Sequence, residues 1–184
     1  GVAPSSVSLK AGSGFVTNYD STLYRYILKD DLKVSVANNV ATFTDIPIYE
    51  GSYISTRTVI NTSLKNQRFV INNPGIDTNT LKVKVFQAAN STISTDYEVA
   101  NNILDIGAND KVFFISEIED EKYEIFFGDG VLGKKLDDGN IVEISYIVTN
   151  GTDTNGAKTF TFNGLMEDEN GATVVAPYAI TSIT

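Results

Sequence analysis

The clearest alternation of apolar and polar positions in the chain lies in Ile141–Val148. Every second side chain there is apolar, and the positions between are partly polar, which is the period-two pattern of a half-buried strand. A second β-run, Tyr123–Phe127, precedes it, and two clusters separate the runs, Gly128–Gly130 and Asp137–Asn140. Asp, Asn and Gly tolerate positive φ, so such clusters reverse the chain at little cost. A third cluster, Asn150–Gly156, follows. We therefore expect a strand, a structured loop, a second strand and a sharp turn after it.

Similar short runs of β-forming residues recur along the rest of the chain, with turn clusters between them. Asn38-Asn39 predicts a hairpin turn within Leu32–Ile46, and the acidic run Glu117–Glu121 predicts a solvated turn between two strands. The other expected strands are Val7–Ala11, Leu23–Leu28, Ile48–Val59, Gln67–Ile71, Leu81–Phe86, Tyr97–Val99, Ile103–Ile106, a fully buried Val112–Ile115, and Thr159–Phe162. Glu167–Gly171 is expected to be a polar loop.

No window of a dozen residues has the three-and-four spacing of an amphipathic helix. Strands about 8–12 residues apart, with turn residues between them, predict a mainly β fold: an antiparallel β-sandwich or a barrel-like domain with little helix. We expect one β-rich domain over residues 1–156, and an extension or the start of a neighbouring unit over residues 157–184. The chain opens Gly1-Val2-Ala3-Pro4 without Met, so we expect a fragment of a longer protein.

Composition narrows the possible functions. Lys and Arg number 14 against 23 Asp and Glu, for a net charge of −9, which disfavours a nucleic-acid surface because phosphate binding needs clustered basic residues. Cys and His are absent, which removes the usual ligands of zinc and the usual nucleophile pairs. No run reaches the roughly 18 apolar residues of a membrane span. We expect no cofactor, no metal, no membrane partner and no small-molecule substrate.

Residues 128–133 fit the dinucleotide pattern G-x-G-x-x-G, and residues 128–134 come one residue short of a phosphate loop. Both motifs bind phosphate only where a helix begins, and here a second turn, Asp137–Asn140, follows instead. That turn and Asp153–Gly156 hint at calcium loops, but neither has the carboxylate that closes such a site. We therefore expect a structural loop that binds no nucleotide.

Two further features have a functional and a structural interpretation. Paired carboxylates can hydrolyse glycosides without His, but no spacing singles out a pair, so we expect no enzyme. The aromatic side chains of Tyr123, Phe126, Phe127 and Tyr146 could form an exposed stacking platform. Because they stand on predicted strands beside Val and Ile, core or cross-strand packing is the better interpretation.

One set of residues forms a distinctive motif around the two turn clusters: Phe127, Gly128, Asp129, Gly130, Gly133, Gly139, Tyr146, Asn150, Gly151, Asn155 and Gly156. This motif resembles the baseplate J family, in particular the baseplate wedge subunit of contractile-tailed bacteriophages. Leu9–Ser13, Tyr49–Gly51 and Thr80–Val85 agree more weakly and in the same order, and Leu136 stands where many relatives have Pro.

The resemblance implies a structural protein of the virion, assembled in the host cytoplasm. Its partners would be other copies of itself and other wedge proteins, in a ring around the central hub. Two alternatives remain: a bacterial contractile injection system or tail-derived bacteriocin, and a carbohydrate-binding or adhesin β-sandwich. The terminal run Ala179–Thr184 would have an exposed edge unless it folds back. We expect the isolated fragment to be a monomer or weak dimer, with ring contacts made in the intact protein.

Overall fold

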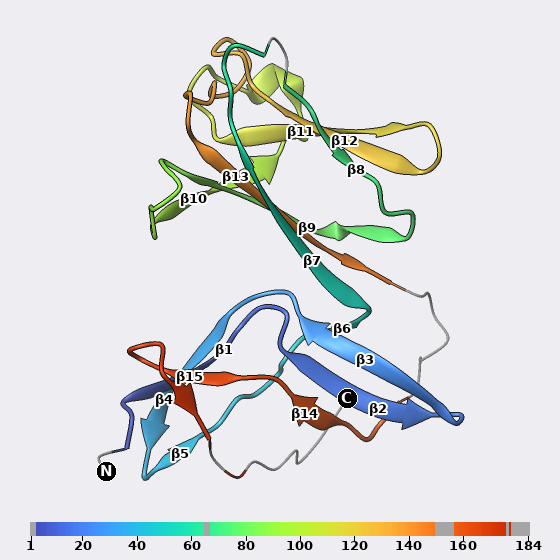
Figure 1. Cartoon of the computed structure of the whole chain (residues 1–184), viewed down its shortest axis with the longest axis vertical. Helices are drawn as coiled ribbons and strands as arrows, with labels where there is room; N and C mark the ends of the chain where they lie inside the picture. The colour runs from blue at the N-terminus through green and yellow to red at the C-terminus, as the bar shows by residue number, and fades with distance from the viewer. Residues whose placement is uncertain (1–2, 65–66, 150–156, 176, 178–184) are drawn as a thin grey trace. The chain divides into compact units, whose positions relative to one another are not determined.

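The computed structural model describes residues 3–64, 67–149, 157–175 and 177. The chain divides into two compact units: the first contains Gly1–Tyr53 and Thr149–Thr184, and the second contains Ile54–Val148. Strands dominate both units (Figure 1), which confirms the mainly β prediction. The boundary expected after Gly156 lies outside the described residues, and the division into 1–156 and 157–184 stays a prediction.

The second unit is built on one seven-stranded sheet. Its order is β7-β13-β9-β10-β11-β12-β8, so that β7 and β8 form the two edges. The β10–β11 pair is parallel, a departure from the antiparallel arrangement expected, whereas β9–β10, β9–β13, β11–β12 and β8–β12 are antiparallel. The strands are β7 (Ser52–Val59), β8 (Phe69–Ile71), β9 (Ile76–Phe86), β10 (Ser94–Val99), β11 (Val112–Ile118), β12 (Lys122–Phe127) and β13 (Ile141–Val148).

Strand β13 lies at the centre of the second unit's core. Its bounds match the prediction, but its burial does not: Val142 and Ile147, on opposite faces, are both 0% exposed. The half-buried interpretation was therefore wrong, because a central strand can be covered on both faces. The register of β13 against β9 shifts between Ser145 and Ile147. At that bulge, buried Thr80 accepts a hydrogen bond from the Ile147 amide through Oγ1, at 2.9 Å.

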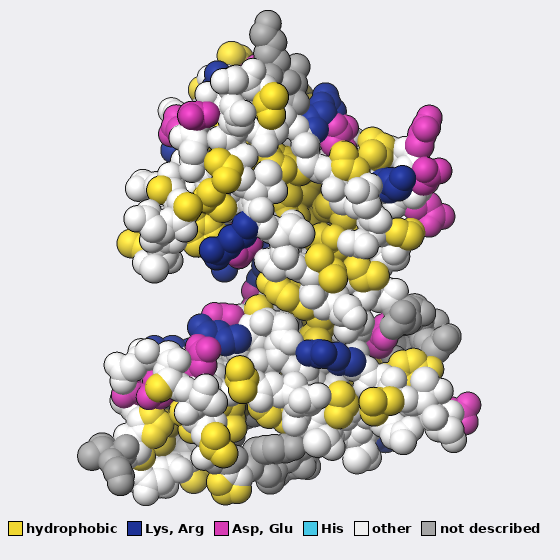
Figure 2. All heavy atoms as spheres, in the orientation of Figure 1, with side chains coloured by type: hydrophobic (Ala, Val, Ile, Leu, Met, Phe, Trp, Pro, Cys, Tyr) yellow, Lys and Arg dark blue, Asp and Glu magenta, His cyan; other side chains and the backbone are white. Residues whose placement is uncertain are grey.

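The β11–β12 hairpin confirms the acidic turn that the sequence predicts. Ile118 pairs with Lys122, and Asp120 and Glu121 between them have φ of 64° and 55°. Figure 2 shows acidic side chains gathered at the tip of this hairpin. The prediction that Val112–Ile115 is fully buried was wrong, because Phe113 alone among these four residues is buried.

The first unit contains two smaller sheets. Its five-stranded sheet has the order β16-β15-β1-β4-β5, and its four-stranded sheet has the order β14-β2-β3-β6. The strands are β1 (Ser6–Leu9), β2 (Gly14–Tyr19), β3 (Thr22–Leu28), β4 (Leu32–Ala37), β5 (Val40–Ala41), β6 (Ile48–Glu50), β14 (Thr161–Asn163), β15 (Met166–Asp168) and β16 (Thr173–Val174).

The first unit's core joins residues from both ends of the chain. Leu9, Phe15, Leu28 and Phe160 are buried together, and the Tyr26 and Phe160 rings meet edge to face at 5.0 Å. The predicted hairpin turn is confirmed in β4–β5: Asn38 and Asn39 have φ of 50° and 61°, the sign that tight hairpin turns require. Strand β5 is short, however, and ends at Ala41.

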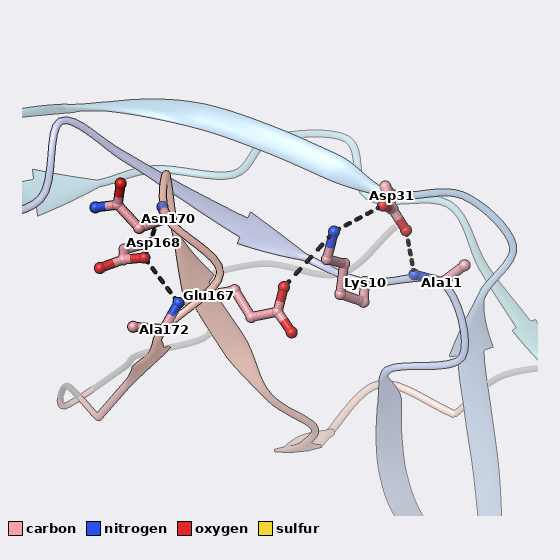
Figure 3. A network of polar contacts seen from close by, with 7 residues as sticks. All are labelled: Lys10, Ala11, Asp31, Glu167, Asp168, Asn170 and Ala172. Atoms are coloured by element: carbon pink, nitrogen blue, oxygen red, sulfur yellow. Dashed lines mark hydrogen bonds and ion pairs between the residues drawn. The ribbon is translucent and has the colours of Figure 1, made fainter. Parts of the chain in front are cut away.

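A polar network ties β15 to the N-terminal strands (Figure 3). The Lys10 ammonium lies 3.1 Å from Asp31 and 3.6 Å from Glu167, and the Ala11 amide donates to Asp31 at 2.8 Å. The hydrogen bond and negative charge of Asp31, with a smaller effect of Glu167, raise the pKa of Lys10. The prediction of a polar loop over residues 167–171 was wrong in part, because β15 extends to Asp168 before the chain turns.

The run Ile103–Ile106 is the clearest error among the predicted strands. Ile103–Asp105 forms a single 3-10 turn, capped by the Asn102 side chain, which accepts from the Leu104 amide. Leu104 is 92% exposed. An apolar run of three or four residues does not by itself distinguish a strand from a turn, and here capping by Asn102 favoured the turn.

Candidate functional site

The loop between β12 and β13, residues 128–140, carries five of the eleven family-motif residues: Gly128, Asp129, Gly130, Gly133 and Gly139. It begins directly after Phe127, the last residue of β12. A Cβ on Gly128 would overlap the backbone carbonyl groups of Leu132 and Gly133, so the loop crosses itself at this point. The Gly130 amide donates to the Gly133 carbonyl at 3.1 Å. Gly130 and Gly133 have φ of 93° and 80°, which glycine adopts without strain.

Asp129 holds the tip of this crossing. Its Oδ1 accepts hydrogen bonds from the Val131 amide at 2.8 Å and the Leu132 amide at 3.1 Å. These bonds favour the ionised carboxylate and lower the pKa of Asp129. The motif residue Asp129 therefore acts as a local turn-former, while Val131 is left 72% exposed at the tip.

A second loop, residues 107–110, supports the first, and the sequence analysis missed it. The Gly133 amide donates to the Gly107 carbonyl at 3.1 Å, and the Lys134 amide donates to the Asp110 carbonyl at 2.8 Å. Asp110 fixes its own loop by accepting from the Gly107 amide at 2.8 Å. The Gly-Ala-Asn-Asp sequence of this loop is itself a turn signal, but no local pattern indicates which loop it will contact.

The cluster Asp137–Asn140 attaches the other end of the 128–140 loop to the segment after β7. The Gly139 amide donates to the Ile60 carbonyl at 3.0 Å, and the Ile60 amide donates to the Asn140 carbonyl at 2.8 Å. Asp138 accepts from the Thr62 amide and hydroxyl at 2.9 and 3.1 Å. The cluster thus forms a fixed turn.

Leu136 fixes the path of this loop by packing into the core. Its side chain is only 7% exposed and belongs to the same core cluster as Tyr97 and Val142. A leucine buried in the core fixes the path of the chain through packing, where a proline would do so by restricting φ. Burial of the Tyr97 side chain raises the pKa of its hydroxyl, and the negative charge of Asp137 raises it further by a smaller amount.

The four aromatic residues do not form one exposed platform. Tyr146 is 4% exposed, and its hydroxyl accepts a hydrogen bond from the Asn73 amide nitrogen. Phe127 meets the Tyr97 ring edge to face at 5.6 Å, and Phe126 stacks on its cross-strand partner Phe114 at 5.1 Å. Tyr123 packs against the core. Core and cross-strand packing, the structural interpretation, is confirmed.

The glycine-rich loop has no free cradle for a phosphate group. The amides of Gly130, Val131, Leu132, Gly133 and Lys134 all donate within the protein, to the partners given above. The next element after the loop is strand β13, so no helix N-terminus supplies further amides. This geometry fits the prediction of a structural loop between two strands.

Other kinds of site find little support in the described part of the chain. It contains no group of three or more acidic residues placed to hold a metal ion, and none of its helices is long and apolar enough to cross a membrane. The remaining motif residues, Asn150, Gly151, Asn155 and Gly156, and the expected turn Asp153–Gly156 lie outside the described residues.

Taken together, the fold and this loop define a β-rich structural module held by backbone contacts and by a core packed with side chains. Residues 55–154 match the family described as bacteriophage baseplate wedge protein gp6, third domain. Because this match spans more than half of the 184 residues, the chain belongs to that family. The wedge-subunit resemblance of the sequence is thereby confirmed, and the protein is a structural component of the phage baseplate, not an enzyme. No curated protein matches the chain.

The matched range corresponds closely to the second unit, Ile54–Val148. Baseplate membership implies baseplate proteins as partners and the virion tail as location.

Proposed function

We propose that this chain is part of a wedge subunit that assembles, with copies of itself and with other wedge proteins, into a ring around the central hub of a contractile phage tail. The observation that carries the proposal is the family match over residues 55–154. The function is mechanical: such rings hold the sheath extended and rearrange when the tail fires. Assembly takes place in the host cytoplasm, and the finished ring belongs to the virion.

The construction of the 128–140 loop supports a mechanical role. Its two ends are fixed by backbone hydrogen bonds to residues 107–110 and to Ile60, and Leu136 is buried in the core. A subunit that transmits force needs elements whose positions are determined by many contacts, and this loop has them on both sides. We also propose that residues 1–156 form one β-rich domain and residues 157–184 an extension or the start of a neighbouring unit. Limited proteolysis of the intact protein tests this division.

A direct test is to delete residues 55–148 from the intact protein and examine tails from infected cells by electron microscopy. We expect wedges or hubs without complete rings. Normal, infective tails from the deletion would contradict the proposal. The control variant is Lys134→Ala. Lys134 contacts Asp110 through its backbone amide and not through its side chain, so this substitution keeps the contact. That variant should assemble as the unchanged protein does.

The runner-up role, in a bacterial contractile injection system or tail-derived bacteriocin, uses the same fold. The genes beside the coding sequence distinguish the two, because a phage also encodes capsid and genome-packaging proteins there.

A further inference from the structure

Two consecutive residues of β7 belong to different compact units. Tyr53 is in the first unit, and Ile54 begins the second. Both lie within the strand Ser52–Val59, so no loop separates them. Successive side chains of a strand point to opposite faces, and in β7 the two side chains pack against different neighbours.

The Tyr53 ring packs on the tight turn at Gly12. A Cβ on Gly12 would lie 3.2 Å from Cδ1 of Tyr53, and Gly12 has φ of 82°. Glycine is therefore favoured here both by the backbone conformation and by the close approach of the ring. The Gly12 amide donates to the Leu28 carbonyl at 2.8 Å, which attaches the turn to the end of β3.

The chain just before Tyr53 is also attached to the first unit. The Gly51 amide donates to the Arg25 carbonyl of β3 at 3.0 Å, and Gly51 is buried. A backbone hydrogen bond and a packed ring, two residues apart, thus fix the start of β7.

Ile54 and the residues after it are attached to the second unit. Ile54 packs against that unit's core cluster. Arg57 forms an ion pair with Glu143 of β13 at 2.6 Å, and its guanidinium lies 4.6 Å from the centroid of the Phe86 ring. Just beyond the strand, the Ile60 backbone is hydrogen-bonded to the loop that precedes β13.

These attachments leave no slack between Tyr53 and Ile54. The Cα atoms of neighbouring residues are held about 3.8 Å apart by a trans peptide, and both residues have packed side chains. Displacement of Tyr53 from the Gly12 turn therefore displaces Ile54 as well, and displacement of Ile54 acts on Tyr53. Thermodynamic coupling of this kind is reciprocal.

We propose that Tyr53 and Ile54 form a coupling joint, through which loosening of the Gly12 turn lowers the local stability of β7, and loosening of β7 lowers that of the turn. Tyr53 is the positioning residue of this joint. Within the described residues β7 has β13 as its only neighbour in the sheet, and Ser55–Val59 are all exposed. A strand with so few contacts is easily displaced, so the joint lets the first unit act on an edge of the second unit's sheet. The coupling does not depend on the proposed function, because it is a property of the chain itself.

Hydrogen exchange of the 184-residue chain tests the joint. Tyr53→Ala removes the ring, and we expect amide exchange to accelerate about tenfold at Gly12 and Ser13 and also along Ile54–Val59. Tyr53→Phe keeps the ring and should exchange as the unchanged chain does. The matched control is Ser55→Ala, at an exposed position on the same strand, which should leave exchange at the turn unchanged.

The reverse direction uses Ile54→Ala, which removes packing on the side of the second unit. We expect it to accelerate exchange at Gly12 and Ser13 as well as in β7, while β11 and β12 keep their rates. If Tyr53→Ala does not fold, Gly12→Ala provides the same test, because its Cβ would displace the Tyr53 ring without removing it.

Three results would overturn the joint. The first is faster exchange confined to the first unit in Tyr53→Ala, or confined to the second unit in Ile54→Ala. The second is unchanged exchange in both variants. The third is acceleration that includes β11 and β12, which indicates a general loss of stability. All three leave the proposed baseplate role standing.

Discussion

The self-crossing of the 128–140 loop makes Gly128→Ala the most informative single substitution. A Cβ at Gly128 would overlap backbone atoms of Leu132 and Gly133. Backbone atoms cannot rotate away as a flexible side chain can, so the crossing strands of the loop must separate. Separation weakens the hydrogen bond from Gly130 to Gly133 and the bond from Gly133 to Gly107.

The size of the effect follows from these contacts. Overpacking costs about 1–3 kcal/mol, and each weakened hydrogen bond adds about 1 kcal/mol, so we expect Gly128→Ala to lower the free energy of unfolding by about 3–5 kcal/mol. Gly139→Ala is the matched control: Gly139 has φ of 79°, but a Cβ there would meet nothing within 4 Å. Its cost is the backbone strain alone, about 1 kcal/mol once the loss of unfolded-state entropy is counted.

Urea denaturation followed by circular dichroism measures both variants. Hydrogen exchange with peptide-level readout then shows whether the loss of stability lies in β12 and β13. This readout distinguishes destabilisation of the second unit from destabilisation of the first. In a thermal melt, at about 2–4 °C per kcal/mol for a chain of this size, the Tm of Gly128→Ala should fall by roughly 10 °C. If Gly128→Ala proves no more destabilising than Gly139→Ala, the close crossing of the loop is not what constrains Gly128, and the reasoning fails.

Three further predictions concern stability, pH and assembly. Thr80→Val should destabilise the chain by about 1–3 kcal/mol in urea denaturation, because the buried Ile147 amide loses its acceptor; Thr80→Ser should restore most of that loss, and equal stability of both variants would refute this role. Asp129 has a lowered folded-state pKa, so its stabilising effect is present above about pH 4, its unfolded pKa, and is lost as the pH falls through the folded value. Asp129→Asn should therefore flatten the stability profile in this acid range, and an unchanged slope would contradict the assignment. Light scattering at two salt concentrations should find the isolated chain monomeric or weakly dimeric, since its net charge of −9 opposes association at low salt; a stable, salt-independent ring would place the self-assembly surface within this chain.

The sequence by itself determined the elements whose causes are local. The Asn38-Asn39 turn, the acidic turn around Asp120, and the bounds of β13 all follow from turn chemistry and alternation within a few residues. The motif residues of the 128–140 loop could also be picked out from the sequence, through their resemblance to the baseplate J family. Gly130 has the positive φ that its place in the motif suggests, whereas Gly128 is required by close approach of the backbone instead.

Only the tertiary structure decided which segments meet. The burial of β13 on both faces depends on the strands that lie beside it. The parallel pairing of β10 with β11 depends on the path of the loop between them. The position of Leu136 depends on a core cluster to which residues distant in sequence contribute. The separation of β7 from β8 in the sheet order is of the same kind, because two strands that follow each other in sequence would ordinarily pair. Hydrogen bonding between strands is almost indifferent to side-chain identity, so partner and register are set by the packing of the whole core.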